Sequence, residues 1–163
     1  MISGGRFARM VKHIWKGIFI IYMFLLFIIV VIKFTGDINI VIDTIRSNRL
    51  QGTGINLVPF RTISSYTGNM NSLSFFNIFG NIIPFIPMGF LLPMAFTSQR
   101  TLKRTMITCF LIICGIEIFQ YVSHLGSFDV DDIILNIFSC LIGFILFIMY
   151  RQFFKKVGSE YSL

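Results

Sequence analysis

The sequence predicts an all-α membrane protein, a bundle of four transmembrane helices with a long extracytoplasmic loop between helices 1 and 2. Hydrophobic residues make up 55% of the 163 residues and charged residues only 13%, a composition typical of membrane proteins. Four apolar stretches are long enough to cross a hydrocarbon layer about 30 Å thick. We therefore expect a single membrane domain covering residues 1–163.

The first predicted span resembles the start of a secretory signal peptide, because it follows basic residues. Lys33 comes directly after it, however, and no small-x-small cleavage motif is present, which favours a retained anchor helix. The later spans lack the polar face that a soluble helix needs. The four helices are expected at about 14–33, 75–96, 105–123 and 130–150, with the extracytoplasmic loop at 34–74.

Lys and Arg residues predict the orientation, because they are retained on the cytoplasmic side during insertion. With both termini in the cytoplasm, only Lys33, Arg46, Arg49 and Arg61 lie outside. The formal charge of +7 does not indicate nucleic-acid binding, because the basic residues flank apolar runs. On the cytoplasmic side this orientation places Arg6, Arg9, Lys12, Lys16, Arg100, Lys103, Arg104, Arg151, Lys155 and Lys156.

The predicted loop contains two features of its own. Residues 37–46 fit a short helix on the membrane surface. The stretch that contains Asn56, Pro59 and Phe60 is too apolar for a free tail, so we expect it to pack back onto the bundle and to contribute to binding.

Polar residues inside the predicted spans indicate a pocket. Asn81, Glu117 and Asn136 each lie about six residues, or roughly 9 Å, below the outer end of their helix. A carboxylate exposed to lipid costs on the order of 2.5–3.5 kcal/mol, so Glu117 should face the bundle interior. Helical spacing places Gln120 beside Glu117, and Asp129 and Asp132 on the face of Asn136. We expect an outward-facing polar pocket formed by these six residues.

Each of these residues also has a structural interpretation. Asn side chains often serve only to join membrane helices. Asp131 begins a helix, where negative charge is favoured, and by helical spacing it faces away from Asp129 and Asp132. We therefore expect the substitution Asp131→Asn to be tolerated. The cysteines lack the spacing of a zinc site, and no phosphate-binding loop, HExxH or GxSxG motif occurs.

Four segments carry a recognisable signature: Asn56-Leu57-Val58-Pro59-Phe60, the run from Asn81 through Pro84, Pro87 and Gly89 to Pro93, Glu117-Ile118-Phe119-Gln120, and the run from Gly126 to Asn136. In this order and spacing they resemble the VanZ family of bacterial membrane proteins. The resemblance implies a plasma-membrane protein associated with low-level resistance to teicoplanin, without a settled biochemical activity. It also implies that the polar positions act together, since Glu117, Gln120, Asp129, Asp132 and Asn136 match the family pattern. Family members commonly carry Gly where this chain has Ser139.

Three functions remain open from the sequence. The leading hypothesis is a non-enzymatic envelope protein that binds a membrane lipid or lipid-linked molecule. The second is a membrane enzyme acting on a lipid head group, with Glu117 as the catalytic acid or base and Asp129 and Asp132 holding a divalent cation. The third is a proton-coupled transporter, for which four spans are few unless the protein forms a homo-oligomer. No other cofactor and no nucleic-acid partner are expected.

Overall fold

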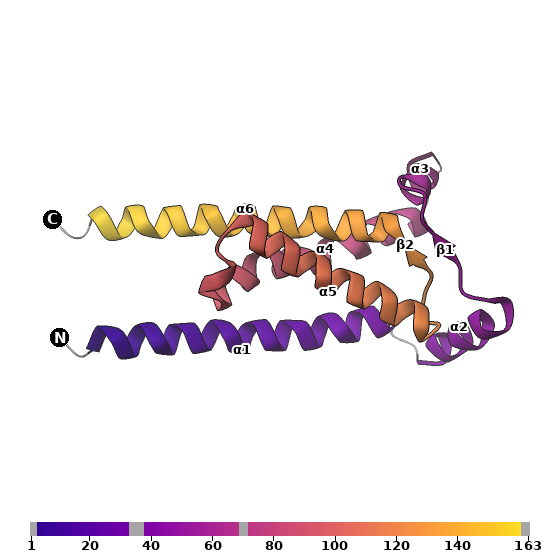
Figure 1. Ribbon diagram of the computed structural model, residues 1–163, viewed down its shortest axis with the longest axis horizontal. Coiled ribbons are helices and arrows are strands. Elements are labelled where there is room, and N and C mark those ends of the chain that lie inside the picture. Colours follow the sequence, from indigo (N-terminus) through magenta and orange to yellow (C-terminus); the bar gives the residue numbers. More distant parts are fainter. Residues whose placement is uncertain (1–2, 33–37, 69–71, 161–163) are drawn as a thin grey trace.

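Four long helices form the protein, in the order that the sequence predicts. The computed structural model describes residues 3–32, 38–68 and 72–160 (Figure 1). The long helices are α1 (Ser3–Ile32), α4 (Ser72–Ala95), α5 (Leu102–Val122) and α6 (Val130–Glu160). Each contains a stretch long and apolar enough to cross a membrane: Arg9–Ile29, Asn77–Ala95, Leu102–Val122 and Val130–Phe154. The predicted four-helix membrane bundle is therefore confirmed.

The first and last helices are longer than predicted. Helix α1 begins eleven residues before the expected position 14, and α6 continues ten residues beyond 150. In both cases the added turns carry Lys and Arg residues, which are good helix formers. The predicted end of the first span, at residue 33, lies outside the described residues.

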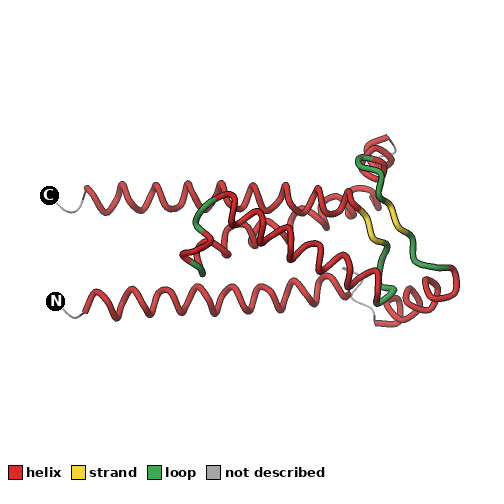
Figure 2. The backbone as a smooth tube through the Cα atoms, viewed as in Figure 1, coloured by secondary structure: helices red, strands yellow, loops and turns green. Residues whose placement is uncertain are grey.

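The segment between α1 and α4 is mostly helical, so the long loop predicted there is not confirmed. It contains α2 (Ile38–Gln51), β1 (Ile55–Asn56) and α3 (Arg61–Gly68). The short helix predicted at 37–46 corresponds to α2, which continues to Gln51. Strand β1 pairs in parallel with β2 (Phe128–Asp129), which lies between α5 and α6; this bridge is drawn in yellow in Figure 2.

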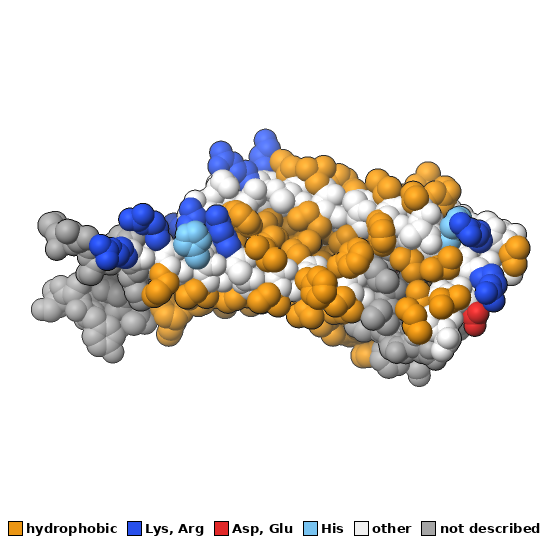
Figure 3. All heavy atoms as spheres, turned by 90° about the horizontal axis from the view of Figure 1, so that it is seen from below, with side chains coloured by type: hydrophobic (Ala, Val, Ile, Leu, Met, Phe, Trp, Pro, Cys, Tyr) orange, Lys and Arg blue, Asp and Glu red, His pale blue; other side chains and the backbone are white. Residues whose placement is uncertain are grey.

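The two ends of the bundle differ in what they carry. Elements α2, β1, α3 and β2 lie at one end, which we call the capped end, and the beginning of α1 and the end of α6 lie at the other, which we call the terminal end (Figure 1). Between them, apolar side chains cover much of the face shown in Figure 3, whereas Lys and Arg side chains lie toward the ends. Such a band is expected where a protein surface contacts lipid.

The most extensive contact between helices is the α4–α6 pair, in which two glycines permit a close approach. A Cβ atom added at Gly89 would lie 1.9 Å from the carbonyl oxygen of Cys140, and one added at Gly143 would lie 2.0 Å from that of Ile86. Only glycine allows the two backbones to approach so closely. Ser139 is fully buried at this contact, and its hydroxyl donates to the carbonyl of Leu135 in its own helix at 2.7 Å.

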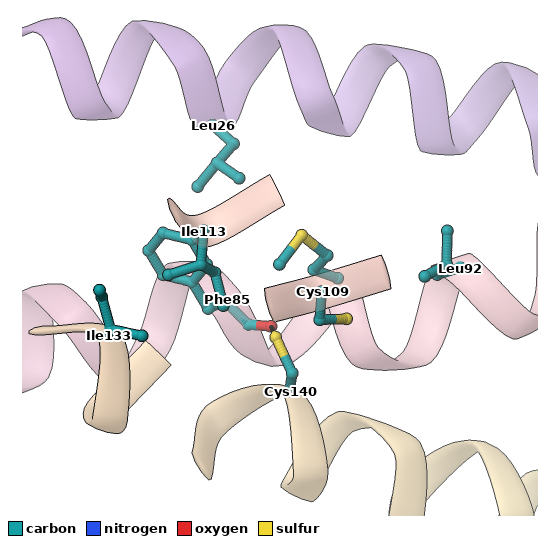
Figure 4. Packing of buried hydrophobic residues seen from close by; sticks show 8 residues of the cluster. Leu26, Phe85, Leu92, Cys109, Ile113, Ile133 and Cys140 are labelled. Atoms are coloured by element: carbon teal, nitrogen blue, oxygen red, sulfur yellow. Dashed lines mark hydrogen bonds between the residues drawn. The ribbon is translucent and has the colours of Figure 1, made fainter. Parts of the chain in front are cut away.

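A small apolar core lies between the four long helices (Figure 4). It includes Leu26 from α1, Phe85 from α4, Cys109 and Ile113 from α5, and Cys140 from α6. The cysteines act as small packing residues here, and the thiol of Cys140 donates to the carbonyl of Phe85 at 3.5 Å. The polar residues predicted inside the spans lie on the side of this core that is nearer the capped end.

Candidate functional site

A polar cavity of about 190 Å³ lies between the helices on the capped side of the core. Its wall combines two carboxyl groups with several amides, and it contains no Lys or Arg among the described residues that line it. Helices α1, α3, α4, α5 and α6 and the loop before β2 contribute the lining residues, which are Ile29, Tyr66, Asn77, Gly80, Asn81, Pro84, Phe85, Ile116, Glu117, Gln120, Ser127, Asp132 and Asn136.

The cavity brings together the polar residues that the spacing analysis placed at one depth. Asn81, Glu117 and Asn136 line it from three different helices, and Gln120 and Asp132 line it with them. Asn56, Pro59, Phe60 and Asp129, which were also predicted to bind, are not part of its wall. The predicted set therefore divides into a cavity group and a group at the capped end.

Two buried residues mark the inner part of the cavity. Glu117 is 2% exposed and Asn136 is 1% exposed. The Oδ1 atom of Asn136 is buried and receives no hydrogen bond from the residues that the structure describes. Buried polar atoms nearly always have a partner, so this oxygen indicates a place where a ligand or water group fits.

Asn81 connects two walls of the cavity. Its Nδ2 atom donates a hydrogen bond of 2.5 Å to Oδ1 of Asp132, which joins α4 to α6. This bond fixes the direction of the Asp132 carboxyl group. Asn81 and Asp132 are therefore positioned together at the cavity wall. A hydrogen bond to a carboxylate is stronger than one between neutral groups.

Proline adds a backbone acceptor to the wall. Pro84 lies inside α4 and has no N–H group, so the carbonyl of Gly80, four residues earlier, cannot receive its usual intrahelical hydrogen bond. Both residues line the cavity. The carbonyl of Pro84 in turn accepts a hydrogen bond of 2.7 Å from the hydroxyl of Tyr22, which ties α1 to α4.

Tyr66 of α3 lies over the cavity and was not among the predicted residues. Its hydroxyl accepts a hydrogen bond of 3.1 Å from Nδ2 of Asn77. Burial raises the pKa of Tyr66, and the charges of Asp132 and Asp129 raise it further, so the phenol stays protonated and can donate. Nothing in the sequence distinguishes Tyr66, because it lies outside the predicted spans, where a polar aromatic residue is not out of place.

Asp129 holds the capped end together instead of lining the cavity. Its Oδ2 atom accepts a hydrogen bond of 2.6 Å from the hydroxyl of Thr62, and Oδ1 accepts one of 3.0 Å from Nδ2 of Asn56. These contacts extend the β1–β2 bridge, in which Asn56 is the register partner of Asp129. The 56–60 stretch therefore packs onto the start of α6, as expected, although Pro59 and Phe60 are exposed.

The surroundings of Asp131 contradict the expectation that this residue only begins a helix and tolerates substitution. Its side chain is fully buried. Oδ1 accepts a hydrogen bond from the backbone N–H of Phe60 at 2.5 Å, and Oδ2 accepts from those of Thr62 at 2.7 Å and Ile63 at 3.1 Å. Asp131 does face away from the cavity, but it does so because it caps the N-terminus of α3, whose first backbone N–H groups have no intrahelical partner.

The carboxylates proposed as metal ligands have different partners. Asp129 binds Thr62 and Asn56, whereas Asp132 binds Asn81. Within residues 3–32, 38–68 and 72–160, no group of three or more His, Cys, Asp or Glu side chains is placed to hold a metal ion. Carboxylate and amide oxygens are suitable ligands for a hard cation. A divalent cation at this place therefore stays a prediction from the sequence.

Four apolar helices with an apolar surface band define a multi-pass membrane protein, and a polar cavity lies between its helices. The VanZ/LLP1 family model matches residues 19–151, from the middle of α1 to near the end of the membrane-crossing part of α6. The chain belongs to this family. No curated protein and no solved structure matches it.

Proposed function

We propose that the protein binds the head group of a membrane amphiphile, a lipid or a lipid-linked envelope molecule, in the polar cavity. The observation that carries this proposal is the convergence of Asn81, Glu117, Asp132 and Asn136 from three membrane helices around one space of about 190 Å³. Buried carboxyl groups are rare in membrane helices and mark functional sites by default.

The cavity wall favours a head group that donates hydrogen bonds. Its carboxyl groups, the Oδ1 atom of Asn136 and the Gly80 carbonyl are all acceptors, and no described Lys or Arg lines the wall. A bare phosphate would meet two carboxyl groups and no Lys or Arg among the described lining residues, so it is a poor match. Head groups with amine or hydroxyl groups are therefore the better match.

The proposed orientation places the capped end, and with it the cavity, outside the bacterial plasma membrane. Arg46, Arg49 and Arg61 are the basic residues of α2 and α3. Basic residues are more numerous toward the cytoplasm, so both ends of the chain would be cytoplasmic. The described basic residues of the terminal end are Arg6, Arg9, Lys12, Lys16, Arg100, Lys103, Arg104 and Arg151.

Such a protein could alter how a lipoglycopeptide reaches its target in the outer leaflet. We propose this effect as the basis of the low-level teicoplanin resistance that the resemblance to VanZ implies. The link would depend on the cavity, because the cavity is where the head group of the amphiphile would bind.

Mass spectrometry of the lipids that co-purify with the protein in mild detergent tests the proposal. Glu117→Gln and Asp132→Asn keep the side-chain shape and remove the carboxyl group. We expect one amphiphile to be enriched with the wild type and at least tenfold depleted from both variants. Asp43→Asn is the matched control, because Asp43 is exposed on α2 and lies outside the cavity.

Equal lipid profiles for all four proteins would refute the proposal. Chemical conversion of the enriched lipid, stimulated by a divalent cation, would instead favour the enzyme hypothesis. In a bacterial host, the same two variants should lose any protection against teicoplanin while Asp43→Asn keeps it.

A further inference from the structure

A second, apolar groove of about 220 Å³ lies between α1 and α5. Almost all of its wall is hydrocarbon, and it contains neither a charged residue nor a hydrogen-bonding side chain among those that line it. Its lining residues are Met23, Leu26, Phe27, Ile112, Gly115, Ile116 and Phe119.

The groove adjoins the polar cavity. Ile116 lines both spaces, with Gly115 on the groove side and Glu117 on the cavity side of the same turn of α5. On α1, Leu26 lines the groove and Ile29, three residues further along, lines the cavity. Residues three apart in a helix lie on one face, so the two spaces follow each other along the α1–α5 side of the bundle.

This side of the bundle is also the loosely packed one. Helix α1 packs mainly against α4 and has few contacts with α5. Phe27 and Phe119 bridge α1 and α5 with ring centroids 5.6 Å apart. A Cβ atom added at Gly115 would meet no atom within 4 Å, in contrast to Gly89 at the α4–α6 contact. An opening toward the membrane is therefore available between α1 and α5 and not between α4 and α6.

We propose that the groove holds one hydrocarbon chain of the amphiphile whose head group occupies the polar cavity, so that the ligand enters between α1 and α5. This inference rests on the proposed function. Lipid tails are as apolar as the groove, so its walls contribute shape and direction more than affinity. The carboxyl and amide groups of the cavity supply the affinity, and the groove selects the chain.

The test uses Gly115→Leu, which places a side chain in the groove, and Gly17→Leu as the matched control. Gly17 also lies in a membrane-crossing helix with no atom within 4 Å of an added Cβ, but it does not line the groove. Leu is a better helix former than Gly, so both variants should fold, which their elution as a single species in size-exclusion chromatography checks.

The probe is phosphatidylethanolamine with a photoreactive diazirine in the middle of one acyl chain, incorporated into proteoliposomes. After illumination, we expect labels to concentrate on Met23, Ile112 and Phe119 in the wild type and in Gly17→Leu. In Gly115→Leu, labelling of these residues should fall at least fivefold. Equal labelling in all three proteins, or labelling no stronger than at the lipid-facing Leu111 and Ile145, would overturn the inference.

Lipid co-purification with Glu117→Gln separates the two ideas. If the lipid is lost from this variant while the groove is unlabelled, the head-group site stands and the chain site fails. If the groove is labelled while the lipid profile does not depend on Glu117, the proposed function fails, and the coupling of groove to cavity fails with it.

Discussion

Asp131→Asn should release α3 from the start of α6 while the four-helix bundle remains folded. The buried carboxylate accepts three backbone hydrogen bonds, two of them at Oδ2, from Thr62 and Ile63. The amide replaces one acceptor oxygen with an N–H₂ group that faces other donors. Losing about two charge-assisted hydrogen bonds costs about 3 kcal/mol, or roughly a hundredfold in the equilibrium between docked and released α3.

Hydrogen–deuterium exchange in nanodiscs measures this effect directly. The amides of Phe60, Thr62 and Ile63 should exchange about a hundredfold faster in Asp131→Asn, and trypsin should cleave more readily after the exposed Arg61. Amides in the α4–α6 contact should be unaffected. The reasoning fails if exchange at residues 60–63 is the same as in the wild type, or if Asp43→Asn produces the same acceleration.

Three further outcomes are expected. Gly89→Ala should lower the melting temperature in detergent, because its Cβ would lie 1.9 Å from a backbone oxygen of α6, whereas Gly17→Ala, with open space, should not; equal melting curves would contradict the packing. A cysteine at exposed Ser65 should react with an impermeant thiol reagent in intact cells and one at Ser98 should not; the reverse pattern would invert the orientation. Tyr66 should titrate above its ordinary pKa of 10.0, so its contribution to stability is present below pH 10 and is lost as pH rises through the folded pKa. In a titration followed by tyrosine absorbance, the wild type should show a late transition that Tyr66→Phe lacks. Identical titration curves for the two proteins would argue against burial of Tyr66.

The membrane helices were predictable because each depends on a continuous apolar stretch, which composition reveals directly. The cavity group was predictable for a related reason. Asn81, Glu117 and Asn136 are each out of place in lipid, and their equal depth follows from helix rise alone.

The roles of Asp131 and Tyr66 could not be derived in this way. Asp131 binds backbone groups about seventy positions earlier in the chain. A helical wheel of α6 predicts the direction of the Asp131 side chain but not the backbone N–H groups that it contacts. The groove between α1 and α5 depends on the distance between two apolar helices. Apolar residues such as Ile112 and Phe119 would be expected equally in a groove and in a closely packed contact, so the sequence does not distinguish the two.

The bridge between β1 and β2 has a consequence for biosynthesis. Phe60 and Asp131 are separated by 71 positions, and the β1–β2 register likewise joins residues 55–56 to 128–129. At about 5–20 residues per second, the ribosome needs roughly 4–14 s to add that length. During this interval the first backbone N–H groups of α3 lack the carboxylate of Asp131, so α3 can place Tyr66 over the cavity only after the start of α6 has been synthesised.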